Sequence, residues 1–314
     1  MEVRNFRQQD LEAYAALWNA AEAGDPDHTT LGAEDVRRRV LEDPSYDPAG
    51  HFVALDGGAI VAGGRGVVVR ERAEAGDTSG WFELHVLPAR LGMEAEREVF
   101  TRIADYLKGR GIKSIVTRVD TRNAARERML QRLGFTRTEY ENHGMERDAR
   151  VAGMPEAPKG YRLRTARMPE EMETLWRVFN EAFSTRKNHV SMSLERFSRL
   201  WYFRDPGNHS GFFVAEREAD GRAVGTVMSG IDGRFNEEHG VGRGGSFALT
   251  VIPSERRKGL GTALLLRSVK WIGDAGMASA YLSVNVANPD ALTIYERAGY
   301  RSVQVYRGYQ FRLP

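Results

Sequence analysis

The stretch Val251–Thr262 has the residue types and spacing that could bind a phosphate. Its sequence is VIPSERRKGLGT, and it lies between a predicted strand and a predicted helix. Gly259 and Gly261 would let the backbone approach a ligand closely, and the first amides of a helix have no partner within it. Such amides, at the positive end of the helix dipole and beside the cations of Arg256–Lys258, are typical of a phosphate site. The alternative is a tight strand-to-helix turn that needs glycine for its geometry alone.

A second group of polar residues follows about thirty residues downstream. Asn288-Pro289-Asp290 predicts a helix start, with an N-cap, a proline in the first helical position and an acid in the first turn. The helix would run to Gly299 and carry Tyr295. From the residues alone, Tyr295 is interpreted as a core aromatic on an apolar helix face beside Leu292.

The elements that position these residues follow from hydrophobic periodicity and from turn residues. A helix is predicted over Leu260–Ile272, with its apolar face formed by Leu260, Leu264, Leu265, Val269 and Ile272. A second helix is predicted over Pro169–Phe183. Strands are predicted over Tyr161–Thr165, Gly211–Arg217, Ala223–Ile231, Phe247–Ile252, the alternating run from Ala280 to Val286, and Tyr300–Phe311. The sum is a mixed α/β fold with a β-α-β-α core after an antiparallel meander.

Together the two motifs resemble the signatures of the GCN5-related N-acetyltransferase (GNAT) family. RRKGLGT resembles the family's pyrophosphate loop, with Arg256, Gly259 and Gly261 at its marked positions. The run from Asn288 through Tyr295 to Gly299-Tyr300 resembles the second signature, a helix that ends in glycine followed by an aromatic residue. The resemblance covers the C-terminal half with its motifs and the N-terminal half by architecture only. It implies an α+β mixed sheet in two tandem acyl-CoA transferase domains.

The resemblance also implies roles for individual residues. Backbone groups at a splayed strand end would pair with the pantetheine amides of acetyl-CoA, and the loop would hold the pyrophosphate. Asn288 would lie beside the pantetheine arm, and Tyr295 would be the catalytic general acid. The residues expected to bind the cofactor are Leu249, Thr250, Val251, Arg256, Arg257, Lys258, Gly259, Leu260, Gly261, Thr262 and Asn288.

The general base is unassigned. The acceptor amine must be neutral to attack, so a base or a water chain is needed. Many relatives carry a glutamate on the strand before the loop or on the next strand, but Gly244–Ala248 and Leu282–Val284 contain no carboxylate. Glu237, Glu238 and His239 are candidates from a preceding turn, although that run is also typical of a solvated turn. Acceptor residues are expected on the loops 184–193 and 205–210.

An internal repeat defines the domain organisation. A shift of 165 residues aligns 80–135 with 245–300 without a gap, and places Asn123 on Asn288 and Gly134 on Gly299. Residues 148–160 between the repeats contain two prolines and two glycines, which is typical of a linker. We therefore expect a degenerate GNAT-like domain at 1–147, a linker at 148–160 and a GNAT-like catalytic domain at 161–314.

The first repeat lacks the residues of the site. Glu94 and Glu96 occupy the positions of Gly259 and Gly261, where their side chains would obstruct a phosphate. In the second motif, Leu130 replaces Tyr295 and Arg126 replaces Ala291. We expect this repeat to bind no acetyl-CoA.

Composition limits the classes of function. The chain has 314 residues, 45 Lys and Arg against 43 Asp and Glu, and no cysteine. The near-neutral charge gives no field toward nucleic acid or anionic lipid, and the missing cysteine excludes thiolate metal sites and a cysteine nucleophile. No apolar window approaches 18 residues, so no membrane span or signal peptide is expected. The histidines have no metal-binding spacing, and the Gly-x-Gly-x-x-Gly match at 240–245 precedes a strand, so it is interpreted as a flexible loop.

These observations favour a cytoplasmic N-acetyltransferase that transfers an acetyl group from acetyl-CoA to an amine, directly and without a metal. A small-molecule acceptor is expected because known tandem relatives include mycothiol synthases and drug acetylases, and a homodimer is one open arrangement. The alternative functions are a non-catalytic acyl-CoA-binding or regulatory module, or transfer of another acyl group or to another acceptor.

Overall fold

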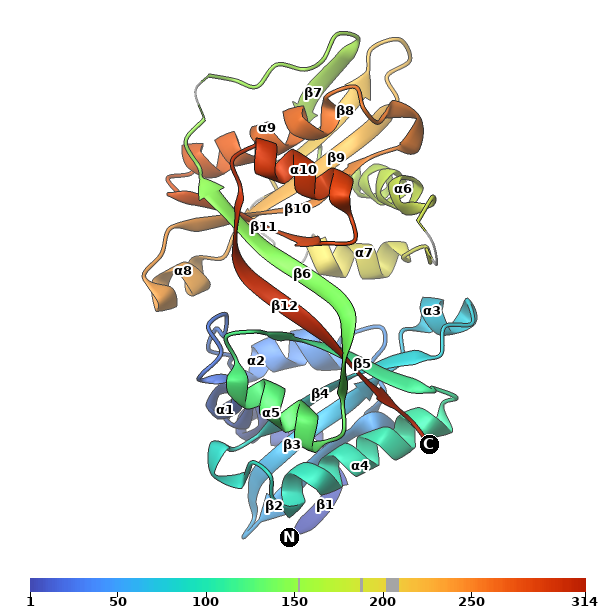
Figure 1. Cartoon of the computed structure of the whole chain (residues 1–314), viewed down its shortest axis with the longest axis vertical. Coiled ribbons are helices and arrows are strands. Elements are labelled where there is room, and N and C mark those ends of the chain that lie inside the picture. Colours follow the sequence, from blue (N-terminus) through green and yellow to red (C-terminus); the bar gives the residue numbers. More distant parts are fainter. Residues whose placement is uncertain (152, 187–188, 202–208) are drawn as a thin grey trace. The chain divides into compact units, whose positions relative to one another are not determined.

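The chain forms two compact units, each with strands and helices. The computed structural model describes residues 1–151, 153–186, 189–201 and 209–314. The first unit contains Met1–Glu141 and Tyr306–Pro314, and the second contains Asn142–Val305. Each unit has the mixed α/β architecture expected from the sequence (Figure 1).

The first unit is an antiparallel meander followed by a parallel strand pair. Its sheet order is β1-β2-β3-β4-β5-β12, with β4 and β5 parallel. Its strands are β1 (Glu2–Asn5), β2 (His51–Asp56), β3 (Ala59–Val67), β4 (Ser79–Val86) and β5 (Ser114–Asp120), with the start of β6 (Thr136–Asp148) and the end of β12 (Arg301–Arg312). Its helices are α1 (Leu11–Glu22), α2 (Ala33–Val36), α3 (Arg70–Glu74), α4 (Glu94–Gly109) and α5 (Ala124–Arg132).

The second unit repeats this topology. Its sheet order is β6-β11-β10-β9-β8-β7, with β10 and β11 parallel. Its further strands are β7 (Tyr161–Thr165), β8 (Phe212–Arg217), β9 (Ala223–Ile231), β10 (Arg243–Val251) and β11 (Ser279–Asn285). Its helices are α6 (Met172–Phe183), α7 (Leu194–Trp201), α8 (Gly233–His239), α9 (Leu260–Asp274) and α10 (Pro289–Arg297). A short 3-10 turn precedes the long crossover helix in each unit, at Pro88–Arg90 and Pro253–Glu255.

Each unit completes its sheet with the last strand of the other repeat. In the first unit the end of β12 pairs antiparallel with β5, with Tyr306 opposite Asp120. In the second unit the end of β6 pairs antiparallel with β11, with Asn142 opposite Asn285. The division predicted at residues 147 and 161 did not anticipate this exchange. The residues of a terminal strand do not by themselves specify its pairing partner.

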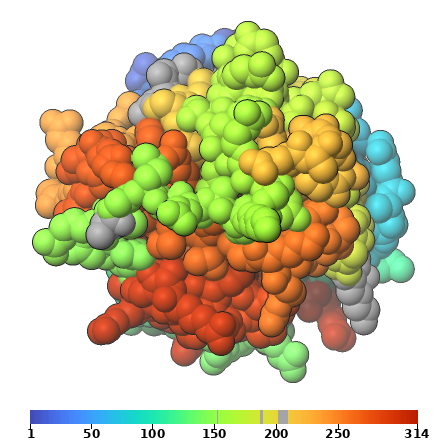
Figure 2. Space-filling view, turned by 90° about the horizontal axis from the view of Figure 1, so that it is seen from above, coloured from blue at the N-terminus to red at the C-terminus, as the bar shows by residue number. Residues whose placement is uncertain are grey.

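The core of the second unit forms where α9 packs on the sheet. The predicted apolar face of α9 is confirmed, since all five of its residues are buried. Ser268 on the same helix bonds to Ser229 of β9 and to Ser246 of β10, at Oγ–Oγ distances of 2.7 and 2.6 Å. The helices α9 and α10 lie side by side on the face shown in Figure 2, in orange and red. These contacts fix α9 over the parallel strand pair.

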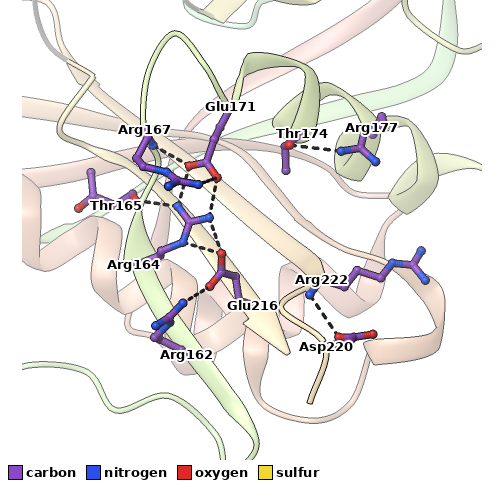
Figure 3. A network of polar contacts seen from close by, with 10 residues as sticks. All are labelled: Arg162, Arg164, Thr165, Arg167, Glu171, Thr174, Arg177, Glu216, Asp220 and Arg222. Carbon is purple, nitrogen blue, oxygen red and sulfur yellow. Dashed lines mark hydrogen bonds and ion pairs between the residues drawn. The ribbon is translucent and has the colours of Figure 1, made fainter. Parts of the chain in front are cut away.

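An arginine–carboxylate network ties the first strand of the second unit to its first helix (Figure 3). Arg164 on β7 donates two hydrogen bonds to Glu171, both of 2.6 Å, and a third to Glu216 of β8. The bonds from Arg164 lower the pKa of Glu171 to about 2. In the first unit Arg4 binds Asp10 in the same bidentate manner, at 2.7 and 2.9 Å. The network is therefore a repeated feature of the fold and not a separate site.

The observed elements differ from the predicted ones by more than two residues at two boundaries. The first helix of the second unit begins at Met172 and not at Pro169. The strand predicted from Phe247 begins at Arg243, because Arg243–Gly245 pair with Ser279–Tyr281. The interpretation of 240–245 as a loop is therefore wrong for its last three residues. Gly244 suits a strand here because a Cβ would lie 2.6 Å from Ile272 Cγ2 of α9.

Candidate active site

The parallel strands β10 and β11 separate after their first three paired residues. The register pairs Arg243–Gly245 with Ser279–Tyr281 and stops there, although β10 continues to Val251 and β11 to Asn285. Such a separation leaves backbone groups on the facing edges of both strands without a ladder partner. An extended ligand with amide groups could pair with these edges as an added strand.

A β-bulge reshapes β10 at this separation. Its pairing with β9 shifts register between Phe247 and Thr250, and Ala248 has a φ of 45°. A positive φ is uncommon for a residue with a side chain and marks a backbone that the surrounding structure holds in place. The bulge breaks the regular alternation along the strand and re-aims the residues beside it. In the first unit β4 pairs with β3 without any shift over Phe82–Val86.

A small pocket lies at the separation and the bulge. It has a volume of about 260 Å³. Leu249 and Tyr295 are the two residues predicted for the site that line it. The complete lining is Ser246, Phe247, Ala248, Leu249, Leu265, Leu282, Ser283 and Tyr295. Ser246 and Ser283 were not predicted for the site, although both lie in the strand segments 244–248 and 282–284, which lack a carboxylate. No carboxylate is among these eight residues.

Tyr295 contributes its ring from α10. Its side chain is buried, and burial raises the pKa of its hydroxyl to about 12, against the opposing charge of Arg186. The phenol therefore keeps its proton across the neutral and mildly alkaline range. A protonated hydroxyl that lines a pocket can donate a proton to a strong base formed there.

The predicted phosphate loop forms an open helix N-terminus. Arg257 and Gly259 both adopt positive φ, 64° and 84°, so the chain turns sharply into α9. The first intrahelical bond is donated by the amide of Ala263 to the carbonyl of Gly259, at 3.0 Å. The amides of Leu260–Thr262 precede that bond, and Gly259 has no side chain that could cap them. This arrangement is typical of an anion site.

The three cations of the loop have different surroundings. The side chain of Arg256 donates to backbone carbonyls of Val251, at 3.2 Å, and of Ala182, so it ties the loop to α6. Lys258 forms an ion pair with buried Glu255, at 2.7 Å. Arg257 is exposed and lies 3.5 Å from exposed Asp290. Arg257 is thus the loop cation held most weakly by its neighbours, because exposed pairs contribute little free energy.

The other predicted residues lie around this loop. Thr250 is buried and its hydroxyl bonds to that of Thr226, at 2.9 Å. Asn288 is the N-cap residue of α10, but its side chain accepts no capping bond. Its counterpart Asn123 in the first unit accepts one from the amide of Arg126, at 3.0 Å. The side chain of Asn288 is therefore not used for capping.

The residues considered for proton transfer and acceptor binding lie elsewhere. Glu237, Glu238 and His239 form the end of α8, and none of them lines the pocket. Residues 187–188 and 205–208 of the two expected acceptor loops lie outside the described residues. Within the described ranges, no group of three or more His, Asp and Glu side chains could hold a metal ion. No helix in those ranges is long and apolar enough to cross a membrane.

In the first unit, two charged side chains occupy the positions that correspond to Gly261 and Ala291 of the second unit. Glu96 stands at the position of Gly261 and is buried at the start of α4. Its carboxylate accepts a hydrogen bond of 2.9 Å from the amide of Gly92 and forms an ion pair with Arg132 at 3.0 Å. Arg126, at the position of Ala291, donates to the carbonyl of Leu84 at 2.8 Å. A carboxylate thus lies where the second unit has an open helix N-terminus.

Comparisons with known proteins agree with a duplicated fold. The model of the acetyltransferase (GNAT) family matches the chain twice, at residues 12–135 and 172–300. A mycothiol acetyltransferase of Frankia alni is 28% identical over 301 residues, covering 91% of this chain and 86% of the relative. A mycothiol acetyltransferase of Thermobispora bispora is 35% identical over 158 residues, covering 46% of this chain and 48% of the relative. The chain thus spans about half the length of that relative.

Two solved structures share the fold along nearly the whole chain. A GCN5-related N-acetyltransferase from Sphaerobacter thermophilus has a TM-score of 0.71 at 18% identity, with coverage of 99% of this chain and 95% of that one. A tandem GNAT protein from the clavulanic acid biosynthesis pathway also has a TM-score of 0.71, at 15% identity, with coverage of 100% and 98%. At such identities the likeness shows the fold alone.

Proposed function

Because the chain belongs to the acetyltransferase (GNAT) family, we propose that its second unit transfers an acetyl group from acetyl-CoA to the amine of a small molecule. The observation that carries this proposal is that one unit combines three features: separated parallel strands, an open helix N-terminus and a buried tyrosine in the intervening pocket. The first unit has the separated strands, but Glu96 lies at its helix N-terminus and Leu130 stands at the position of the tyrosine.

In this proposal acetyl-CoA binds along the open edge of β10. The amides of Leu260–Thr262 and the exposed cation Arg257 bind the pyrophosphate, because unpaired amides and a weakly held cation both gain from an anion. The backbone beyond the bulge at Ala248 pairs with the pantetheine amides. The carbonyl of Val251 already accepts a bond from Arg256 and offers only its second lone pair.

The acetyl group enters the pocket that Leu249 and Tyr295 line. The neutral amine nitrogen attacks the carbonyl carbon of the thioester and forms a tetrahedral intermediate. The C–S bond then breaks, and the thiolate of coenzyme A takes the hydroxyl proton of Tyr295. The nitrogen gives up its extra proton to the tyrosinate through solvent, so Tyr295 regains its initial state. No covalent enzyme adduct forms, and the products are the N-acetylated amine and coenzyme A.

A small-molecule acceptor is supported by the relatives, several of which are mycothiol acetyltransferases. The pocket of about 260 Å³ also suits the reacting end of a small molecule. The first unit is proposed to bind no acetyl-CoA, because Glu96 and Arg126 fill the places that the pyrophosphate and the pantetheine arm would need.

The test combines calorimetric titration with acetyl-CoA and an assay of coenzyme A release in the presence of a panel of primary amines. An acetyltransferase binds acetyl-CoA and releases coenzyme A faster with at least one amine. Binding without any release, with amines or with water alone, would instead indicate the non-catalytic acyl-CoA-binding module. Absence of binding would overturn both functions.

A further inference from the structure

One pocket-lining side chain of the second unit is held by a residue of the first repeat. Ser283 lies on β11 and lines the pocket, whereas Asn142 lies on the exchanged strand β6. In the antiparallel register Gly144 is opposite Ser283, so Asn142 is its diagonal neighbour on the same face of the sheet. The amide nitrogen of Asn142 donates a hydrogen bond to Ser283 Oγ.

This bond determines what the Ser283 hydroxyl has left to offer. A serine hydroxyl has two lone pairs and one proton. Asn142 uses one lone pair, which fixes the position of the oxygen. The second lone pair and the proton remain for a ligand, and Ser283 is an exposed residue that lines the pocket.

The other polar side chains that line the pocket have different partners or roles. Among the eight lining residues these are Ser246 and Tyr295. Ser246 is buried and its hydroxyl bonds to Ser268 at 2.6 Å. Tyr295 is the proposed proton donor to the thiolate. Ser283 is therefore the lining hydroxyl that remains for the acceptor.

The equivalent pair in the first unit lacks this chemistry. There Gly308 of β12 is opposite Arg118 of β5, which matches the pairing of Gly144 with Ser283. Tyr306 takes the place of Asn142, and the Arg118 guanidinium lies over its ring, 5.4 Å from the centroid. The amide–hydroxyl pair thus occurs in the unit that has the pocket and not in the one whose site is filled.

We propose that Asn142 is a positioning residue for the acetyl acceptor: it fixes Ser283 Oγ, which accepts a hydrogen bond from the N–H of the attacking amine. The amine is then held with its lone pair free for the thioester carbon, and Ser283 takes no part in bond making or proton transfer. This inference rests on the proposed function. It also gives the exchanged strand β6 a role at the site of the second unit.

The test compares Asn142→Ala, Ser283→Ala and the double variant with the full-length wild-type protein. Glu146→Gln is the matched control, because Glu146 lies on the same strand opposite Tyr281 and does not line the pocket. Three quantities are measured for each: the calorimetric Kd of acetyl-CoA, the melting temperature, and coenzyme A release with water alone and with glucosamine, spermidine or tyramine. Ser283→Thr, which keeps the hydroxyl, serves as the conservative variant.

We expect Asn142→Ala and Ser283→Ala to lower coenzyme A release, whether water or amine is the acceptor, by about three- to tenfold, as for the loss of one neutral hydrogen bond. The double variant should be no slower than the slower single variant, since both remove the same interaction. The Kd of acetyl-CoA and the melting temperature should change little, and Ser283→Thr should restore most of the release.

Two outcomes overturn the inference. The first is that the wild type is active and Asn142→Ala releases coenzyme A as fast as the wild type does, or that Glu146→Gln slows the release as much as Asn142→Ala does. The second is a parallel loss of acetyl-CoA affinity and thermal stability in Asn142→Ala, which would reveal a purely structural role. A wild type that binds acetyl-CoA but releases no coenzyme A to any acceptor would instead contradict the proposed function itself, and this inference with it.

Discussion

The guanidinium of Arg126 donates a hydrogen bond of 2.8 Å to the carbonyl oxygen of Leu84 in the first unit. The corresponding residues of the second unit are Ala291 and Leu249, and there the small alanine leaves the strand edge open. Arg126 also pairs with Glu22 at 2.9 Å, so it is held on both sides. The first repeat thus satisfies with its own side chain a strand carbonyl for which the second repeat has only the small side chain of Ala291 at the corresponding position.

The first prediction concerns stoichiometry. Titration of the full-length protein with acetyl-CoA should give one binding site per chain, because Arg126 and Glu96 fill the first unit. Isothermal calorimetry measures this number directly. Two sites of comparable affinity would show that these side chains move aside and that the first unit also binds the cofactor.

The second prediction concerns the phosphate loop. Gly261→Glu should abolish acetyl-CoA binding, because it places a carboxylate at the helix N-terminus, as Glu96 does in the first unit. Gly261→Ala is the matched control, since a Cβ there would meet only Ile294 Cδ1, at an ordinary 3.5 Å. The alanine variant should keep its affinity within about threefold. Retained affinity in Gly261→Glu would refute the assignment of the loop.

The third prediction concerns Tyr295. Tyr295→Phe should lower kcat by about 10- to 1,000-fold with little change in the Kd of acetyl-CoA, because general acid catalysis contributes effects of about that size. Burial holds the pKa of Tyr295 at about 12. The wild type should therefore keep its kcat as the pH rises from 7 to 10, since the acid stays protonated. An unchanged kcat in Tyr295→Phe would reduce this residue to a packing role.

The fourth prediction concerns the pH dependence of stability. His51 is fully buried and stacks on Phe6, with ring centroids 4.2 Å apart. Burial lowers the pKa of His51 to about 3. The unfolded chain, with a histidine pKa of about 6.5, therefore binds more protons than the folded one between these values. The contribution of His51 to the free energy of unfolding is therefore fully present above pH 6.5. It is lost as the pH falls toward 3.

Denaturant titrations at pH 7 and pH 5 measure this effect. The free energy of unfolding of the wild type should fall by about 2 kcal/mol more than that of His51→Phe over this interval. The phenylalanine keeps the stacking on Phe6 and removes the titrating group. An equal fall in both proteins would mean that another group is responsible.

The fifth prediction concerns the exchanged strands. Cleavage of the chain between residues 153 and 158 should leave two fragments that stay associated, because each unit contains a strand of the other repeat. Size-exclusion chromatography after insertion and cleavage of a protease site measures this. Fragments that separate and remain folded would contradict the exchange.

Local sequence determined much of this protein. The periodicity of Leu260–Ile272 determines which face of α9 is buried, and the glycines at 259 and 261 allow the turn and the close approach at its start. Each of the two motifs is a continuous stretch of sequence, and Tyr295 lies in the second, so both could be found without the fold. The replacement of a glycine by Glu96 in the first repeat was also visible in the sequence, and it predicts that this repeat binds no acetyl-CoA.

Only the tertiary structure decided which strands pair and which side chains meet. An alternating strand specifies its buried face but not its partner, so the exchange of β6 and β12 could not be predicted. The meeting of Asn142 with Ser283 follows from that exchange across 141 positions of sequence. The partners of the Arg126 guanidinium, Glu22 and the carbonyl of Leu84, likewise depend on long-range packing. Residue types thus determined the chemistry available, whereas the spatial register of distant segments determined which groups are left free to perform it.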